Sequence, residues 1–166
     1  MSLRLEDIEL IRQLKYRYCR AIDTCDIDAL REIVTEDIRT DYAGGSYRWQ
    51  VQGRDAFLEA IRGSFTADCV AVHTVHHPEI EVLDDVSARG TWYLTDTFIH
   101  LKENVVTEGS ALYRDRYLKT PDGWRIRVST YERIYERVER LSASPNLTAH
   151  RLAGKLPNRS SWSSLE

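Results

Sequence analysis

Three long segments of alternating polar and apolar residues constrain this fold more than any other feature. They span about residues 87–101, 105–119 and 124–136, with turn residues at 102–104 and 121–123. Alternation of period two predicts strands with one buried face, and short polar turns join antiparallel neighbours. Strands usually have about five or six residues. Strands this long in a single small domain must curve, so we expect a bent sheet around a concave volume.

The part of the chain before these segments is predicted to be mostly helical. Apolar residues at steps of three and four, such as Ile11, Leu14, Tyr18 and Ile22, predict a first helix over about 3–24. Further elements are predicted as helices at 27–34 and 54–65, a strand–turn–strand unit at 38–42 and 47–51 around Gly44-Gly45, and strands at 70–77 and 79–83. Helices and a hairpin followed by an antiparallel meander are the α+β pattern.

Composition excludes several classes of protein. The 166 residues are 42% apolar and 30% charged, which is typical of a folded domain, with a net charge of −3. No clustered basic face suggests nucleic-acid binding, and no apolar run approaches the ~20 residues of a membrane span. We expect no secretory signal and a cytoplasmic location. We predict one domain over 1–141 and a C-terminal tail over 142–166, ordered against a neighbouring subunit.

One carboxylate interrupts the predicted buried face of the segment 87–101. The even-numbered positions carry Ala88, Trp92, Leu94 and Phe98, and Asp96 lies among them. A buried carboxylate is costly unless it is paired or hydrogen-bonded. Asp96 therefore either bonds to backbone amides or a buried arginine for structure, or it orients a catalytic histidine.

Histidines cluster at residues 73–77, immediately before Pro78. His73 and His77 share one face of a strand but lie about 13 Å apart at ~3.3 Å per residue, too far for one metal ion. We predict no metal site. His73, preceded by three apolar residues, is the better candidate for a buried catalytic imidazole. The three cysteines, Cys19, Cys25 and Cys69, form no CxxC pair and read as small buried hydrophobes.

The first predicted helix carries Tyr18 in its buried stripe and Asp23 at its end. Taken alone, each has an ordinary structural explanation, a core tyrosine and a helix-end residue. Together with His73 and Asp96 they would supply acid–base groups to a pocket. The aromatic residues Trp92, Phe98 and Tyr113 are expected to line its wall.

At these residues the sequence resembles the SnoaL-like branch of the NTF2-like superfamily, over about residues 5–136. The similarity is closest to small dehydratase-type members, with bile acid 7α-dehydratase and scytalone dehydratase among the relatives. The motifs that carry it are Arg17-Tyr18-x-x-Ala21-x-Asp23, His73-x-x-x-His77-Pro78, Ala88-x-Gly90-x-Trp92, Tyr113-x-Asp115 and Asp122-Gly123-Trp124.

The resemblance implies an α+β cone, in which a strongly curved antiparallel sheet wraps around three helices and encloses one deep pocket. It implies catalytic roles for Tyr18, Asp23, His73 and Asp96, without a cofactor. His77 stands where relatives often carry Asn, and Arg133 matches a family arginine only if the register of the last strand allows. Relatives form dimers or trimers through the outer sheet face, where we expect a homo-oligomer contact through Tyr93, Tyr131 and Tyr135.

The predicted function is a cofactor-independent dehydratase acting on a hydrophobic, polycyclic or steroid-like hydroxy-carbonyl compound. His73 would remove a proton next to the carbonyl, because imidazole exchanges protons readily near neutral pH. Asp96 or Asp23 would orient His73, and Tyr18 would donate to the enolate oxygen. The same groups fit a ketosteroid-isomerase-like isomerase or a polyketide cyclase, and the fold also fits a non-catalytic ligand-binding protein.

Overall fold

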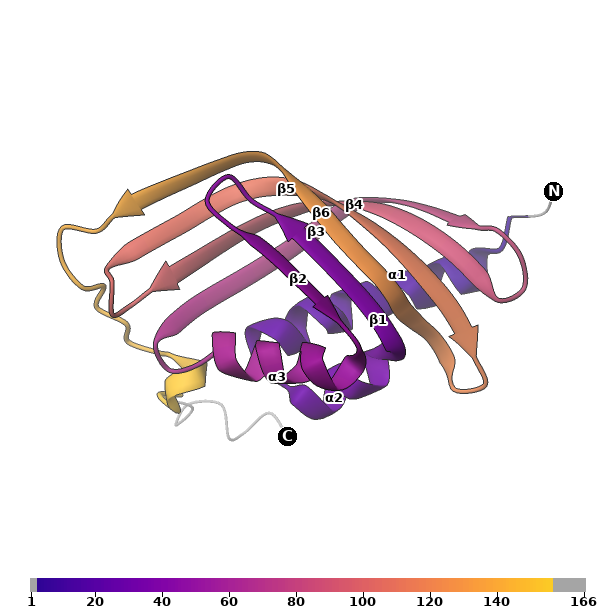
Figure 1. Cartoon of the computed structure of the whole chain (residues 1–166), viewed down its shortest axis with the longest axis horizontal. Coiled ribbons are helices and arrows are strands. Elements are labelled where there is room, and N and C mark those ends of the chain that lie inside the picture. The colour runs from indigo at the N-terminus through magenta and orange to yellow at the C-terminus, as the bar shows by residue number, and fades with distance from the viewer. Residues whose placement is uncertain (1–2, 157–166) are drawn as a thin grey trace, which may run out of the picture.

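The computed structural model describes residues 3–156 and confirms the predicted order of elements (Figure 1). The helices are α1 (Leu5–Asp23), α2 (Ile27–Ile33) and α3 (Arg54–Ser64), with a 3-10 turn η1 (Arg151–Ala153) near the C-terminal end. The strands are β1 (Val34–Ala43), β2 (Arg48–Gln52), β3 (Cys69–Val82), β4 (Ser87–His100), β5 (Val105–Thr120) and β6 (Gly123–Arg140). Each predicted element is present; β5 and β6 are longer than predicted, and β4 ends one residue earlier.

The two strands predicted at 70–77 and 79–83 are one continuous strand, β3. Its pairing with β4 shifts between His76 and Glu79, which marks a β-bulge. His77 has a positive φ of 49° there, and Pro78 has no N–H to donate to a ladder. The proline therefore interrupts the pairing locally without ending the strand, which separates His73 and His77 in orientation.

All six strands form one sheet in the order β2-β1-β6-β5-β4-β3. The long strands pair antiparallel, as predicted, but β1 runs parallel to β6. The sheet is therefore mixed. The β1–β2 hairpin lies at one edge of the sheet, beside the last strand β6. The α+β cone expected from the sequence is confirmed, with the three helices on the concave side of the sheet (Figure 1).

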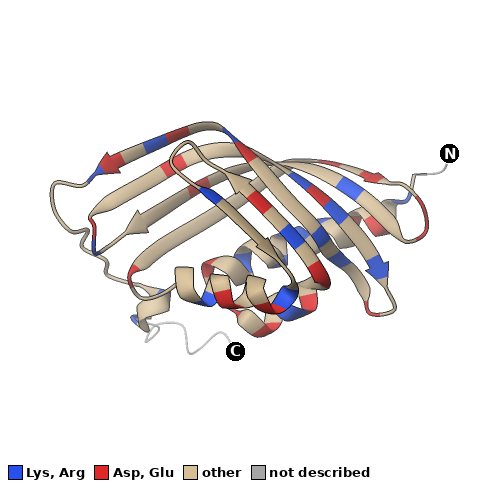
Figure 2. Cartoon of the chain, viewed as in Figure 1, with Lys and Arg blue, Asp and Glu red and all other residues tan. Residues whose placement is uncertain are grey.

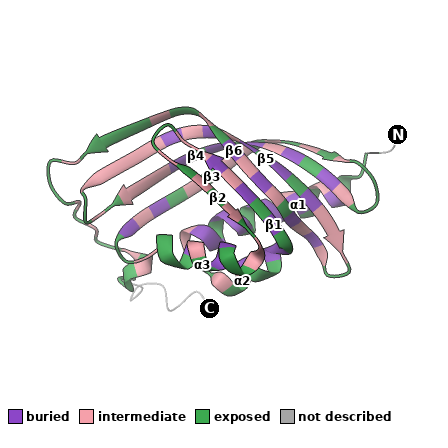
Figure 3. Ribbon diagram, viewed as in Figure 1, coloured by how far each residue is buried: buried purple, intermediate pink, exposed green. Residues whose placement is uncertain are grey.

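Helix α1 covers one end of the concave face. Its buried stripe, which includes Ile11, Leu14 and Ile22, packs against the sheet with the apolar residues of α3 and β1. Each such side chain contributes roughly 1.5–3 kcal/mol when buried. Figure 3 shows buried residues concentrated where helices lie against the strands, whereas the end of β4, the start of β5 and the end of β6 carry mostly intermediate and exposed residues.

Strand β6 owes its curvature to two bulges, opposite Ser110/Ala111 and Arg116/Tyr117 of β5. A bulge bends a strand and reverses the alternation of its faces. As a result, Tyr131 is buried on the concave side, while Tyr135 is exposed. The expectation that Tyr131 lies on the outer face with Tyr93 and Tyr135 is therefore wrong. The predicted subunit contact through Tyr93 and Tyr135 stays a prediction.

Beyond β6, residues 142–156 cross the end of the molecule opposite the chain's N-terminus (Figure 1). His150 Nε2 lies 2.8 Å from the carbonyl oxygen of Cys69 at the start of β3. The rest of the predicted tail, 157–166, lies outside the described residues. Within the described part of the chain, no helix combines the length and apolar character needed to cross a bilayer. Acidic and basic residues are interspersed over helices and strands (Figure 2).

Candidate active site

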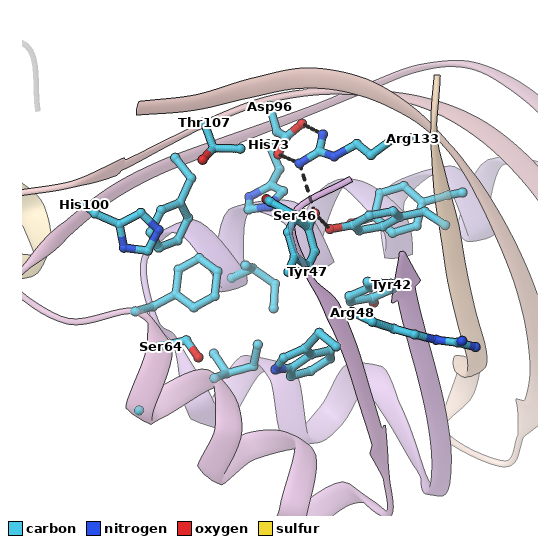
Figure 4. A pocket seen from close by; sticks show the side chains of 18 of the residues that line it. Tyr42, Ser46, Tyr47, Arg48, Ser64, His73, Asp96, His100, Thr107 and Arg133 are labelled. Carbon is cyan, nitrogen blue, oxygen red and sulfur yellow. Dashed lines mark hydrogen bonds and ion pairs between the residues drawn. The ribbon is translucent and has the colours of Figure 1, made fainter. Parts of the chain in front are cut away.

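A cavity of about 660 Å³ opens in the part of the concave face that α1 leaves uncovered (Figure 4). This volume is typical of small-molecule sites. One part of its wall is polar and is formed by Ser46, His73, Asp96, His100, Thr107 and Arg133. Another part is apolar and is formed by Ile22, Trp49, Ile61, Phe65 and Phe98. Five tyrosines line it as well: Tyr18, Tyr42, Tyr47, Tyr113 and Tyr131.

His73 lines this cavity and is hydrogen-bonded to Asp23, which lines only the smaller cavity described below. Asp23 stands at the C-terminal end of α1, and its Oδ1 lies 2.6 Å from His73 Nδ1. Its other oxygen accepts the backbone N–H of His73 at 2.9 Å. The carboxylate accepts a hydrogen bond from Nδ1–H. It therefore favours the imidazole tautomer that carries its proton on Nδ1 and leaves Nε2 as the proton acceptor. Of the two aspartates considered from the sequence, Asp23 is the one that orients His73.

Asp96 lies directly across from His73 on β4 but bonds to a different partner. Arg133 of β6 donates both Nη atoms to its carboxylate, with Nη2–Oδ2 at 2.9 Å, and both side chains are almost fully buried. The prediction that Asp96 orients the catalytic histidine is therefore wrong, and the structural alternative, a buried arginine, holds. Burial lowers the pKa of Arg133, but the hydrogen bonds and charge of Asp96 outweigh it and raise that pKa.

Arg133 can reach Asp96 across β5 because Gly109, which lies between them, has no side chain in the way. Gly109 of β5 lies between the two in the sheet, and a Cβ atom there would stand 2.4 Å from the carbonyl oxygen of Tyr135 and 3.1 Å from Arg133 Nη1. The bulge opposite Arg116/Tyr117 shifts the concave positions of β6 from even to odd residue numbers, which turns Arg133 to the concave side. Neither the bulge nor the register it sets follows from simple alternation, which is why the sequence does not place Arg133.

Tyr18 lines the cavity, but its hydroxyl is already engaged. It lies 2.6 Å from the Tyr42 hydroxyl in a buried contact, and burial raises the pKa of Tyr18 well above its ordinary value. Burial also raises the pKa of Tyr42, while hydrogen bonds with Ser129 and Tyr18 act in the opposite direction. Ser129 donates in turn to Asp115 at 2.8 Å. The predicted role of Tyr18 as a donor to substrate stays a prediction, with this competing bond in place.

A second pair of tyrosines lies at the polar end. The hydroxyls of Tyr47 and Tyr131 are bonded to each other, and Arg133 Nη2 donates to Tyr47 at 3.0 Å. Tyr47 stands beside the tip of the β1–β2 hairpin, and the ring of Tyr131 stacks on that of Tyr42 at 4.5 Å between centroids. The sequence pattern predicts only a strand–turn–strand unit here and gives it no role in the site. The tyrosines on both sides of Gly44-Gly45, Tyr42 and Tyr47, are the sequence signal that could have placed this hairpin at a pocket.

The predicted aromatic wall is partly right. Phe98 and Tyr113 line the cavity, but Trp92 does not. Trp92 is fully buried in the core, where its indole N–H donates to the Tyr117 hydroxyl at 2.9 Å. Alternation along β4 correctly places Trp92 on the concave side. Helix α1 covers that position, so Trp92 packs against the helix instead of lining the cavity.

A smaller cavity of about 380 Å³ lies on the other side of the histidine, lined by Cys19, Asp23 and His73 among others. His73 thus forms part of a thin wall between the two cavities. Burial raises the pKa of Cys19 to about 12, so its thiol keeps its proton and lacks the thiolate character of a nucleophile. Among residues 3–156, no group of three or more His, Cys, Asp and Glu side chains is placed to hold a metal ion.

A curved sheet wrapped around three helices, with one aromatic pocket on its concave side and an aspartate-bonded histidine in the pocket wall, defines a small-molecule domain of the NTF2-like type. The family model described as SnoaL-like domain matches residues 3–130, and the chain belongs to this family.

Solved structures share the fold at low sequence identity. A protein named Putative Scytalone Dehydratase from Novosphingobium aromaticivorans superposes with a TM-score of 0.71 at 18% identity, covering 84% of this chain and 92% of that one. The hexachlorocyclohexane dehydrochlorinase LinA-type3 from Novosphingobium barchaimii superposes with a TM-score of 0.71 at 14% identity, covering 87% and 96%. The function-unknown protein Rv3472 (D26N) from Mycobacterium tuberculosis gives 0.64 at 25% identity, covering 92% and 85%.

Proposed function

We propose that this protein is a cofactor-independent lyase that removes water from a hydrophobic hydroxy-carbonyl compound. The observation that carries the proposal is His73, hydrogen-bonded to Asp23, in the wall of an aromatic cavity. Two structural neighbours support this reaction class, since one is named as a dehydratase and another as a dehydrochlorinase. Both names denote an elimination reaction, and the low identities leave the substrate of this chain to experiment.

In the proposed reaction, Nε2 of His73 takes a proton from the carbon next to the carbonyl. The electron pair of that C–H bond forms the new C=C bond as the C–O bond to the hydroxyl breaks. The imidazolium then returns its proton to the departing hydroxide, so water leaves and His73 is neutral again. Asp23 stabilises the imidazolium through Nδ1. General acid–base catalysis of this kind contributes about 10²–10⁴ in rate.

The flat apolar walls favour a fused-ring substrate. Phe65 and Phe98 pack edge to face with 5.8 Å between their centroids, and Tyr113 and Trp49 line other parts of the cavity. Aromatic walls bind planar hydrophobic rings through burial and ring stacking. The Asp96–Arg133 pair would supply the polar end against which the oxygenated part of such a molecule lies.

The test is turnover of a panel of fused-ring β-hydroxy ketones and steroid thioesters, followed by the absorbance of the conjugated enone. We expect His73→Ala and Asp23→Asn to lower kcat by about 10²–10⁴, with unchanged thermal unfolding. His76→Ala is the matched control, because His76 lies outside the pocket and bonds to Thr95. Near wild-type turnover by both site variants would contradict the proposal. Mass spectrometry of the product separates dehydration from isomerisation or cyclisation, in which no water is lost.

A further inference from the structure

The polar end of the pocket carries one hydroxyl proton that no described protein group accepts. Arg133 Nη2 lies 3.0 Å from the Tyr47 hydroxyl oxygen. A guanidinium can only donate hydrogen bonds, so Tyr47 is the acceptor in this one. The hydroxyls of Tyr47 and Tyr131 share one hydrogen bond, which uses one of their two protons. Among residues 3–156 neither hydroxyl has a further hydrogen-bond partner. One O–H of this pair therefore remains available to a ligand.

Tyr47 is the better placed of the two tyrosines to give this proton to a ligand. Tyr131 is buried, with 8% of it exposed, and stacks on Tyr42, whereas Tyr47 is only half-buried in the cavity wall. Burial raises the pKa of both phenols, so both hydroxyls keep their protons. The proton of the buried Tyr131 is therefore assigned to the shared bond. The Tyr47 oxygen then accepts from Tyr131 and Arg133 together. Accepting two hydrogen bonds polarises its own O–H and makes it a stronger donor.

The deeper pair, Tyr18 and Tyr42, is less accessible to a ligand. Their hydroxyls share one buried hydrogen bond at 2.6 Å. Tyr18 is only 3% exposed and Tyr42 only 8%. Of the five tyrosines that line the cavity, Tyr47 alone is not buried.

The hairpin holds Tyr47 in place over the pocket. The backbone N–H of Ser46 donates to Glu136 on β6 at 2.9 Å. Gly44 allows the ring of Tyr47 to lie directly on the backbone, since a Cβ there would stand 2.4 Å from that ring. The donor is therefore positioned before any ligand arrives, and a preorganised donor loses little freedom on binding.

The charges around Tyr47 select the kind of acceptor. Arg133 lies between two buried carboxylates, with Asp96 on one side and Glu136 Oε2 at 3.5 Å from its Nε on the other. One guanidinium against two carboxylates leaves a formal charge of −1, and Asp23 adds another beside His73. An anionic ligand group is repelled here, whereas a neutral oxygen is not.

We propose that Tyr47 donates a hydrogen bond to a neutral carbonyl oxygen of the ligand, and that Arg133 and Tyr131 act as its positioning residues. The assignment rests on the proposed function for the identity of that oxygen as the carbonyl next to the abstracted proton. It narrows the substrate class to neutral ketones, in preference to carboxylates or phosphorylated compounds. In the reaction the same bond strengthens as negative charge develops on the oxygen.

The test uses two probes of nearly equal shape, 2-acetylnaphthalene and 2-isopropenylnaphthalene, in which C=O is replaced by C=CH₂. We expect the wild-type protein to bind the ketone about three- to tenfold more tightly than the alkene, the range of one neutral hydrogen bond. Tyr47→Phe brings this ratio to about one and leaves the alkene affinity unchanged. Tyr131→Phe lowers the ratio without abolishing it, since Arg133 still holds Tyr47. Isothermal titration calorimetry measures both affinities.

Tyr93→Phe on the outer face of β4 is the matched control and keeps the wild-type ratio. An unchanged ratio in Tyr47→Phe, equal weakening of both probes, loss of the ratio in Tyr18→Phe instead, or a wild-type protein that binds neither probe would overturn the assignment. The ratio needs no turnover. If it behaves as expected while His73→Ala keeps full turnover, the lyase proposal fails and the Tyr47 assignment stands.

Discussion

Two ion pairs lie on the concave face of one sheet and are built from similar parts, yet they do different things. At the covered end, Lys15 of α1 meets Asp115 of β5 with Nζ–Oδ2 at 2.8 Å, and both side chains are 0% exposed. At the open end, Arg133 of β6 meets Asp96 of β4, with side chains 7% and 6% exposed. A pair of bonded tyrosines adjoins each.

The difference between them is the cover that α1 provides. Under the helix, Asp115 accepts hydrogen bonds from the Tyr117 and Ser129 hydroxyls in addition to its contact with Lys15. The Lys15 ammonium approaches the Tyr113 ring at 3.4 Å and is paired by charge rather than by a well-directed hydrogen bond. Every partner in this network is another protein group, which makes it structural. At the open end, the Tyr47 hydroxyl contacts only Tyr131 and Arg133 among the described residues, and we expect its remaining partner to be a ligand.

Removing the covered cation is expected to have the largest effect on stability. Lys15→Met keeps most of the volume but leaves Asp115 as a buried charge without its counter-ion, which costs about 3–5 kcal/mol. Urea unfolding followed by circular dichroism measures this loss. Lys102→Met is the control, because Lys102 pairs with Asp68 at the surface, where such pairs contribute about 0–1 kcal/mol. If Lys15→Met lowered the free energy of unfolding by less than about 1 kcal/mol, the Lys15–Asp115 pair would be accessible to water rather than buried.

A second buried carboxylate, Asp7 on α1 itself, predicts a pH effect. The hydrogen bond from Lys119 lowers the pKa of Asp7 from 3.8 to about 2, with further bonds from Trp124 and Arg4, against the opposing effect of burial. Because the folded pKa is the lower one, this stabilisation is present above pH 3.8 and is lost as pH falls toward 2. It amounts to about 2 kcal/mol.

Unfolding free energies measured between pH 5 and pH 2.5 should therefore fall more steeply for the wild-type protein than for Asp7→Asn. The variant should also be less stable at pH 5 by about the same amount. Identical pH slopes for the two proteins would show that Asp7 is not held ionised by these contacts.

At the open end, loss of the carboxylate is expected to cost less. In Asp96→Asn, Arg133 keeps Glu136 and Tyr47 as partners, so we expect about 1–2 kcal/mol, near the value of one charged hydrogen bond. The same urea titration measures it. A loss as large as that of Lys15→Met would remove the distinction between the two ends. The ketone-to-alkene binding ratio should fall as well, since Arg133 positions Tyr47.

The smallest expected effect separates the two tyrosine pairs. Tyr18→Phe removes one buried hydrogen bond to Tyr42 and should cost about 1 kcal/mol. Its ketone-to-alkene ratio should equal that of the wild-type protein, because the Tyr18 hydroxyl is buried and bonded to Tyr42. A stability loss with an altered ratio would place the donor at the covered end instead.

Much of the fold was predictable because local patterns repeat. Alternation on β4 gave the correct concave face, including Asp96, and the helical spacing of Ile11, Leu14 and Ile22 gave the correct face of α1. The partners of the buried charges were not predictable in the same way. Asp96 was expected to serve His73, its direct cross-strand neighbour, but a residue 37 positions later, Arg133, takes it.

Two local departures from regularity account for most of the errors. The bulge opposite Ser110/Ala111 puts Tyr131 and Arg133 on one face and Tyr135 on the other, although all three have the same parity. The position of α1 along the sheet then buries Trp92 and leaves Phe98 at the pocket. Neither a bulge nor the reach of a helix is encoded in residue periodicity.

The amino-acid order alone determined the elements, the curvature of the long strands and the candidate residues His73, Asp23 and Asp96, since these depend on contacts within a few residues and on the alternation of faces. Only the tertiary structure decided which carboxylate is hydrogen-bonded to His73, which ion pair α1 covers and which tyrosine of the cavity is least buried. Those outcomes depend on distances between segments far apart in the chain, set by strand register and helix placement.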